Sequence, residues 1–146
     1  MDELSLKLCD IQGRLFELSG KQSIPSAAFI RFFMASRTAK DLDSTYNRAQ
    51  WMGEEYLLEE VKDAAGEGLS GPGDVFPKDV LYWIGYVYRY WHFYTGEESA
   101  KILRQAPVAT MRRNYAVFHT MDPSLAIEDL KEIGGQKRRR AAMQWQ

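Results

Sequence analysis

The sequence is short of the residues that cross-link or strongly charge small proteins. It has a single cysteine, Cys9, among 146 residues, so the chain cannot form an internal disulfide. Its 19 lysines and arginines nearly balance 20 aspartates and glutamates, which leaves a net charge of -1. This balance excludes a whole-surface attraction to nucleic acid or to an anionic membrane. We expect Cys9 to be a packing residue in a protein of a reducing compartment.

Long hydrophobic runs are also absent. The most apolar stretch, residues 80–94, would reach about 22 Å as a helix, which is short of the ~30 Å hydrocarbon layer of a bilayer. The N-terminal segment MDELSLKLCD is acidic and amphipathic, whereas a secretory signal starts with basic residues and a continuous apolar region. We therefore expect a cytoplasmic protein with no membrane association.

Sustained alternation of apolar and polar residues is missing, and apolar residues instead recur at spacings of three and four. This spacing predicts an all-α fold, a single-domain bundle of six or seven helices around a central aromatic-rich helix at about 77–95. The helical domain is predicted to span 1–133 and to stop at Gly134 and Gly135, followed by a basic, flexible C-terminal tail over 134–146. Residues 66–77, rich in glycine and proline, are predicted to form the longest loop.

The stretch 80–94 reads VLYWIGYVYRYWHFY and contains eight of the 19 aromatic residues. Only Gly85, Arg89 and His92 interrupt its apolar and aromatic character. At 100° per residue these three share a strip about 60° wide on the predicted helix. A buried arginine needs an anionic partner, so we predict a structural ion pair between Arg89 and Glu60 or Glu54 of a helix over about 45–65. The alternative is that the strip faces water or a partner.

Aromatic side chains beside an arginine are typical of recognition surfaces. The candidate partner-binding residues are Arg89, His92, Tyr82, Tyr86 and, near the C-terminus, Trp145. An exposed edge of this helix also suits pairing of two copies of the chain, so homo-oligomerisation stays open.

Catalytic motifs are scarce. His92 suits general acid–base chemistry, which makes a small enzyme centred on His92 the third hypothesis. However, no nucleophile motif, glycine-rich phosphate loop or paired-carboxylate motif accompanies it, and no histidine pair has metal-ligand spacing on one helical face. We therefore predict no catalytic residue, no metal and no cofactor.

Two basic segments allow nucleic-acid binding as a second hypothesis. Residues 95–115 resemble a helix-turn-helix whose second helix, after Pro107, exposes Arg112 and Arg113, although Arg104 and Gln105 occupy a turn that usually holds glycine and an apolar residue. The predicted tail contributes four further cations, Lys137, Arg138, Arg139 and Arg140. The alternative function is thus a DNA-binding transcriptional regulator, which the balanced net charge does not favour.

Residues 42–60, 80–102 and 109–130 together resemble a family of small all-helical bacterial proteins associated with toxin-antitoxin loci. The resemblance covers about 29–131 and contains no catalytic motif. It implies a protein-binding role, in which the helical body neutralises a toxin encoded nearby by covering its active surface. The function that we predict first is accordingly a non-enzymatic, protein-binding antitoxin.

Overall fold

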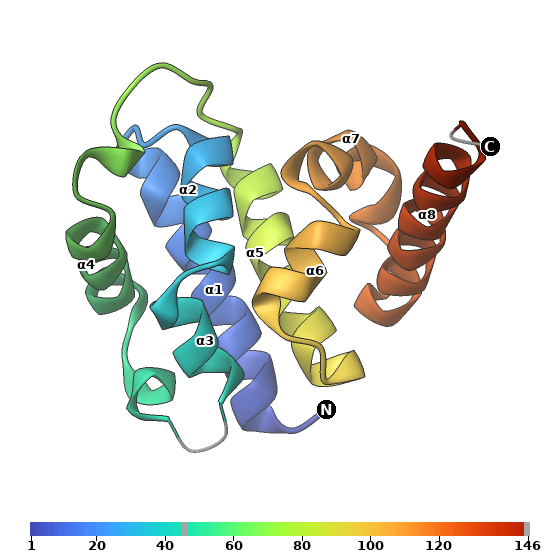
Figure 1. Ribbon diagram of the computed structural model, residues 1–146. Coiled ribbons are helices and arrows are strands. Elements are labelled where there is room, and N and C mark those ends of the chain that lie inside the picture. The colour runs from blue at the N-terminus through green and yellow to red at the C-terminus, as the bar shows by residue number, and fades with distance from the viewer. Residues whose placement is uncertain (45–46, 145–146) are drawn as a thin grey trace.

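The computed structural model describes residues 1–44 and 47–144, and at residue 48 the backbone alone (Figure 1). Within these residues the chain forms eight α-helices and two short 3-10 helices, η1 and η2, and no strand. In chain order the elements are α1 Glu3–Lys21, α2 Ser26–Met34, α3 Arg37–Asp43, η1 Arg48–Trp51, α4 Glu54–Ala65, η2 Gly66–Leu69, α5 Lys78–Thr95, α6 Ser99–Gln105, α7 Val108–Phe118 and α8 Pro123–Gln144. The all-helical prediction is confirmed, and the predicted six or seven helices come close to the observed number.

The aromatic-rich helix α5 begins and ends at residues suited to those positions. Pro77 precedes its first turn, where a missing backbone N–H costs no hydrogen bond. Gly96 ends it in a left-handed conformation at φ 80°, and its N–H donates to the carbonyl of His92. The predicted bounds of this helix, about 77–95, therefore agree with the structure.

Helices α1 and α5 lie side by side through the middle of the molecule, with α2, α3 and α4 on one side and α6, α7 and α8 on the other (Figure 1). Glycines allow their close approach. A Cβ on Gly85 would lie 2.5 Å from the backbone oxygen of Gln12, and a Cβ on Gly13 would lie 2.7 Å from the ring of Tyr82. Because backbone cannot move aside as a side chain can, the spacing between the two helices depends on Gly85 having no side chain.

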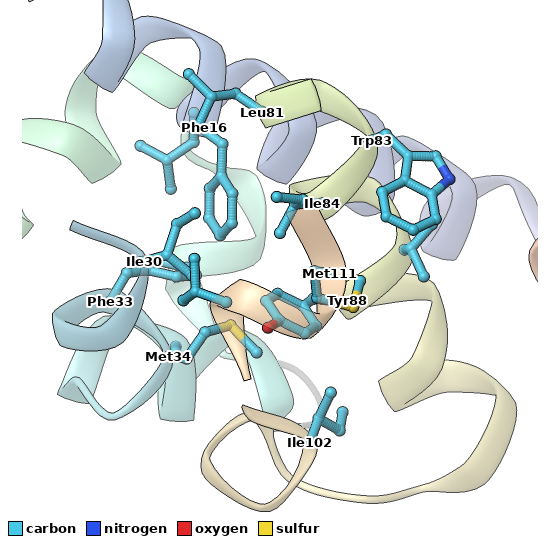
Figure 2. Packing of buried hydrophobic residues seen from close by; sticks show 14 of the residues in the cluster. Phe16, Ile30, Phe33, Met34, Leu81, Trp83, Ile84, Tyr88, Ile102 and Met111 are labelled. Atoms are coloured by element: carbon cyan, nitrogen blue, oxygen red, sulfur yellow. The ribbon is translucent and has the colours of Figure 1, made fainter. Parts of the chain in front are cut away.

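The hydrophobic core fills the space between α1, α2, α5, α6 and α7 (Figure 2). The ring of Phe16 on α1 meets those of Phe29 and Phe33 on α2 edge-on, with centroids 5.6 and 5.5 Å away. Ile84 and Tyr88 complete the core from α5, and the Tyr88 hydroxyl donates to the carbonyl of Ala106 at 2.5 Å. Edge-to-face rings add to the stabilisation that burial of their apolar area supplies.

Polar contacts join the end of α5 to α6 and α8. The Glu97 carboxylate accepts hydrogen bonds from Trp91 Nε1 at 2.9 Å, from Gln105 Nε2 at 2.7 Å and from Lys131 Nζ at 2.7 Å. Desolvation acts to raise the pKa of Glu97, but the donors, Lys131 first, outweigh it and hold the pKa well below its usual range. The charged Glu97 carboxylate therefore links α5, α6 and α8 through these hydrogen bonds.

Helix α8 does not stop at Gly134 and Gly135, so the predicted boundary there is wrong. The helix continues to Gln144 and includes the basic cluster. The physical reason lies in packing, because a Cβ on Gly134 would sit 2.6 Å from the carbonyl oxygen of Gln105 at the end of α6. The missing side chain allows α8 to approach α6 and does not end the helix.

Cys9 is buried against α5. Desolvation raises the pKa of its thiol to about 12, so the sulfur stays protonated at neutral pH. A buried, protonated thiol behaves as a small apolar side chain, which agrees with the packing role expected from its neighbours.

Candidate functional site

The polar strip of α5 faces the interior of the protein. The Arg89 side chain is 0% exposed, and its guanidinium donates to Asp43 Oδ1 at 2.6 Å and to Gln12 Oε1 at 2.8 Å. The expected ion pair with Glu60 or Glu54 is wrong, since Asp43 at the end of α3 is the partner. Asp43 belongs to a short helix that comes before the segment in which the partner was expected.

Glu60 and Glu54 have other roles. Glu60 accepts a hydrogen bond from the Thr38 hydroxyl at 2.6 Å, which joins α4 to α3. Glu54 lies in the first turn of α4, where a carboxylate interacts favourably with the positive end of the helix dipole.

Every polar group around Arg89 has a partner. Ser99 Oγ accepts from Arg89 Nη2 at 3.1 Å and donates to Asp43 Oδ1 at 2.7 Å, and the Ser99 N–H donates to Asp43 Oδ2 at 2.9 Å. Gln12 Nε2 donates to the Gly85 carbonyl at 2.9 Å. We call Arg89, Asp43, Gln12 and Ser99 the Arg89 cluster. Among the described residues no buried side-chain nitrogen or oxygen lacks a hydrogen bond, so this cluster has no group left over for a ligand.

The electrostatics of the cluster fit a structural ion pair. Desolvation lowers the pKa of Arg89, and the facing Asp43 carboxylate opposes that shift. Arg89 is buried in this fold, so its predicted role as a structural ion-pair residue fits the structure better than its predicted role as a partner contact. It ties α5 to α1, α3 and α6.

His92 is the member of the strip that lies nearest the surface. Its Nδ1 donates to the Glu97 carbonyl at 2.7 Å and lies 3.6 Å from Asp43 Oδ1. A groove of about 300 Å³ adjoins it, lined by Asp43, Ser44 and Phe93 among others. Within the described residues, no group of three or more His, Cys, Asp and Glu side chains is arranged to hold a metal ion. The third hypothesis, a small enzyme centred on His92, stays untested.

The two arginines of the predicted recognition helix differ in their surroundings. Arg112 lies 3.6 Å from Asp74 and stacks over the ring of Phe76 at 4.2 Å from its centroid, so it holds the loop before α5. Arg113 is exposed. DNA binding stays a prediction, and Arg112 already has an intramolecular role.

The basic cluster lies on the exposed C-terminal part of α8. Lys137 Nζ donates to Thr110 Oγ1 at 3.2 Å, and Arg139 Nη2 lies 3.5 Å from Glu132 on the same helix. Arg138 and Arg140 are exposed. Trp145, predicted as an anchor for a partner, lies outside the residues that the structure describes.

A neighbouring face of α5 borders an aromatic cleft of about 490 Å³ between α1, the end of α7 and the start of α8. We call it the tyrosine cleft. It is lined by Glu17, Asp79, Tyr82, Trp83, Tyr86, Val87, Tyr115, His119, Met121 and Pro123.

The rings around the cleft are held in place by one another. Tyr115 meets Trp83 edge-on at 5.8 Å between centroids and stacks on His119 at 4.4 Å. On α5, Tyr86 lies 5.9 Å from Tyr82 and 6.2 Å from Tyr90. Rings packed in this way lose little further freedom when a partner binds, which favours affinity.

The polar groups at the cleft are less fully paired than those of the Arg89 cluster. The Tyr82 hydroxyl donates to Asp10 Oδ1 at 2.5 Å, and desolvation together with this carboxylate raises the pKa of Tyr82. Desolvation also raises the pKa of Tyr86. In the described part of the chain the Tyr86 hydroxyl has no hydrogen-bond partner, and neither Glu17 nor Asp79 forms an ion pair.

Sequence reasoning identified Tyr82 and Tyr86 but missed Trp83, Tyr115 and His119. A signal for the α5 part of the cleft was present, because Tyr82, Tyr86, Tyr90 and Tyr94 follow one another at intervals of four. That interval places side chains one above the other along a helix. The contribution of α7 depends on how that helix packs against α5, which no spacing within one helix reveals.

No protein-family model, curated protein or solved structure matches this chain. In the described residues, none of the helices combines the length and the apolar character that a membrane crossing requires.

Proposed function

We propose that this protein is a non-enzymatic protein-binding module and that the tyrosine cleft is its contact site. The observation that carries the proposal is a set of half-buried tyrosines and the buried Trp83, packed around a cleft beside α5 that the Arg89 cluster does not line. Tyrosine and tryptophan are the residues most enriched among those that dominate binding energy at protein interfaces.

The extent of the tyrosine row favours a protein partner over a small molecule. Tyr90 continues the row beyond the cleft, and Tyr94, 44% exposed, donates to Glu128 of α8 at 2.9 Å. From Tyr82 to Tyr94 the row covers about 18 Å at 1.5 Å per residue. A surface of that length suits a segment of another protein, whereas a small ligand would occupy only the cleft.

The narrower proposal is that the partner is a toxin encoded nearby and that the protein acts as its antitoxin in a bacterial cytoplasm. Support for this identity comes from the resemblance of residues 29–131 to helical proteins of toxin-antitoxin loci. An antitoxin works by covering its partner, which requires a contact surface and no catalytic group.

Co-expression with the product of the neighbouring gene tests both proposals. We expect a complex that co-elutes in size-exclusion chromatography, and we expect Tyr86→Ala and Tyr115→Ala each to weaken it by about 2 kcal/mol, or about 30-fold in dissociation constant. Tyr56→Ala is the matched control, because Tyr56 is 50% exposed on α4 and does not line the cleft. Separate elution of the two proteins would contradict the antitoxin proposal. Equal binding by Tyr86→Ala, Tyr115→Ala and wild type would contradict the assignment of the cleft.

A further inference from the structure

The side chains of the tyrosine cleft that are charged at neutral pH irrespective of histidine are all acidic. Two carboxylates, Glu17 and Asp79, lie in its lining together with one histidine, His119, and among the described residues the lining includes no lysine and no arginine. Glu17 is half-buried and Asp79 is exposed, and the described part of the chain offers neither of them a cation within ion-pair distance. This differs from Glu97 and Asp43, whose carboxylates are paired with Lys131 and Arg89.

Aromatic side chains line the cleft together with these carboxylates. Trp83, Tyr86 and Tyr115 line the same cleft, and the Tyr115 ring meets that of Trp83 edge-on. The face of an aromatic ring carries the negative part of its quadrupole and attracts a cation placed over it. Carboxylates and ring faces therefore favour the same kind of ligand group, and both disfavour an anion such as a phosphate.

We propose that the tyrosine cleft receives the guanidinium group of an arginine side chain presented by a partner protein. This inference rests on the proposed function and names the chemistry of the partner. A guanidinium is planar, stacks on aromatic faces and donates two parallel hydrogen bonds to a carboxylate, so it can use Trp83 or Tyr115 together with Glu17 or Asp79. A lysine ammonium lacks the planar group. At about 490 Å³ the cleft lies in the range of sites for small ligands, ~300–1,000 Å³, which suits one inserted side chain.

The test uses a minimal probe and its uncharged isostere. N-acetyl-arginine amide is titrated into the full chain labelled with ¹⁵N and ¹³C, and the Trp83 indole and Tyr115 ring signals are followed by NMR. We expect saturable shifts with a dissociation constant on the order of 1 mM, as for a single side chain without its protein. N-acetyl-citrulline amide has the same shape without the charge, and we expect it to bind at least about tenfold more weakly.

Carboxylate variants identify the groups responsible. The double variant Glu17→Gln, Asp79→Asn keeps shape and hydrogen-bonding capacity, so we expect it to stay folded and to lose about tenfold or more in affinity for the arginine probe. The matched control is Asp63→Asn, Glu67→Gln, two exposed acidic residues outside the cleft lining. This control is expected to bind the probe as the wild type does. Equal binding of the citrulline probe, or an unchanged affinity of the Glu17, Asp79 double variant, would overturn the proposal.

The outcome is separable from that of the proposed function. If the arginine probe does not bind while Tyr86→Ala still weakens the protein complex, the cleft is a contact site of different chemistry and the arginine assignment fails alone. The arginine can also belong to a second copy, because α8 exposes Arg138 and Arg140. Sedimentation velocity of the full chain decides this point: self-association that Arg138→Gln, Arg140→Gln abolishes would overturn the assignment to a separate protein.

Discussion

The two faces of α5 differ in how fully their polar groups are paired. The face with Gly85 and Arg89 packs on α1, and its arginine, although surrounded by apolar helix, is held by three side chains at 2.6–3.1 Å. The face with Tyr82 and Tyr86 carries only the charge of Asp79 and borders a cleft that Glu17 of α1 also lines. In the described residues the Tyr86 hydroxyl has no hydrogen-bond partner, and neither carboxylate forms an ion pair. The charged residue in an aromatic helix thus serves the fold, while the neutral tyrosines border the candidate site.

The largest expected effect on stability comes from removing Asp43, the ion-pair partner of Arg89. Asp43→Ala leaves a buried guanidinium without its counter-charge, and we expect the free energy of unfolding to fall by about 3–5 kcal/mol. Urea denaturation followed by circular dichroism measures it. Asp41→Ala is the control, because Asp41 pairs with Arg37, which is 86% exposed, and such pairs contribute about 0–1 kcal/mol. A cost within 1 kcal/mol of this control would contradict the structural role of the Arg89 cluster.

The close contact between α1 and α5 gives the next largest effect. Gly85→Ala places a Cβ 2.5 Å from the Gln12 backbone oxygen, so the helices must separate, and we expect a loss of about 1–3 kcal/mol in the free energy of unfolding. Gly68→Ala is matched to it, because a Cβ at Gly68 meets nothing within 4 Å. We expect that control to be neutral or slightly stabilising. If both variants unfold at the same urea concentration, the glycine contact is not what fixes the helix spacing.

A variant of Glu97 tests the contacts that join the end of α5 to α6 and α8. Because its donors lower the pKa of Glu97 in the folded protein, the folded state binds fewer protons than the unfolded state. The resulting stabilisation is fully present above the ordinary pKa of 4.5 and decreases as the pH falls below it. Glu97→Gln is expected to cost about 1–2 kcal/mol at neutral pH, and this difference from wild type should shrink in acid. Urea titrations at a series of pH values measure it, and a difference that stays constant with pH would contradict the role of the charge.

The smallest effect compares two tyrosines of α5, one in the hydrophobic core and one at the cleft. Tyr88 is buried and its hydroxyl donates to the Ala106 carbonyl, so Tyr88→Phe should cost about 1 kcal/mol in the free energy of unfolding. Tyr86→Phe should cost close to nothing, because its hydroxyl has no partner in the described residues. Thermal denaturation of the two variants side by side shows the difference, and equal costs would mean that the Tyr86 hydroxyl is bonded within the fold.

The helices could be predicted from the sequence more accurately than the contacts between them. Periodicity placed Gly85, Arg89 and His92 on one strip of α5, and in the structure Gly85 and Arg89 face inward together. It did not identify Asp43, because that residue ends a short helix in a segment that reads as a polar break. It also misjudged Gly134, since a glycine that ends a helix and a glycine that admits a neighbouring helix look the same in sequence. Four of the ten residues that line the tyrosine cleft come from α7, the start of α8 and the segment between them, whose position depends on packing across the whole domain.

The pairing of α1 with α5 also affects how the protein is made. Gln12 and Gly85 touch although 73 residues separate them. At a synthesis rate of about 5–20 residues per second, α1 leaves the ribosome on the order of 4–15 s before its partner does. During that interval the apolar face of α1 has no α5 to cover it. A polypeptide that ends before Lys78 lacks α5 altogether, so a chain of that length cannot form the central pair of helices.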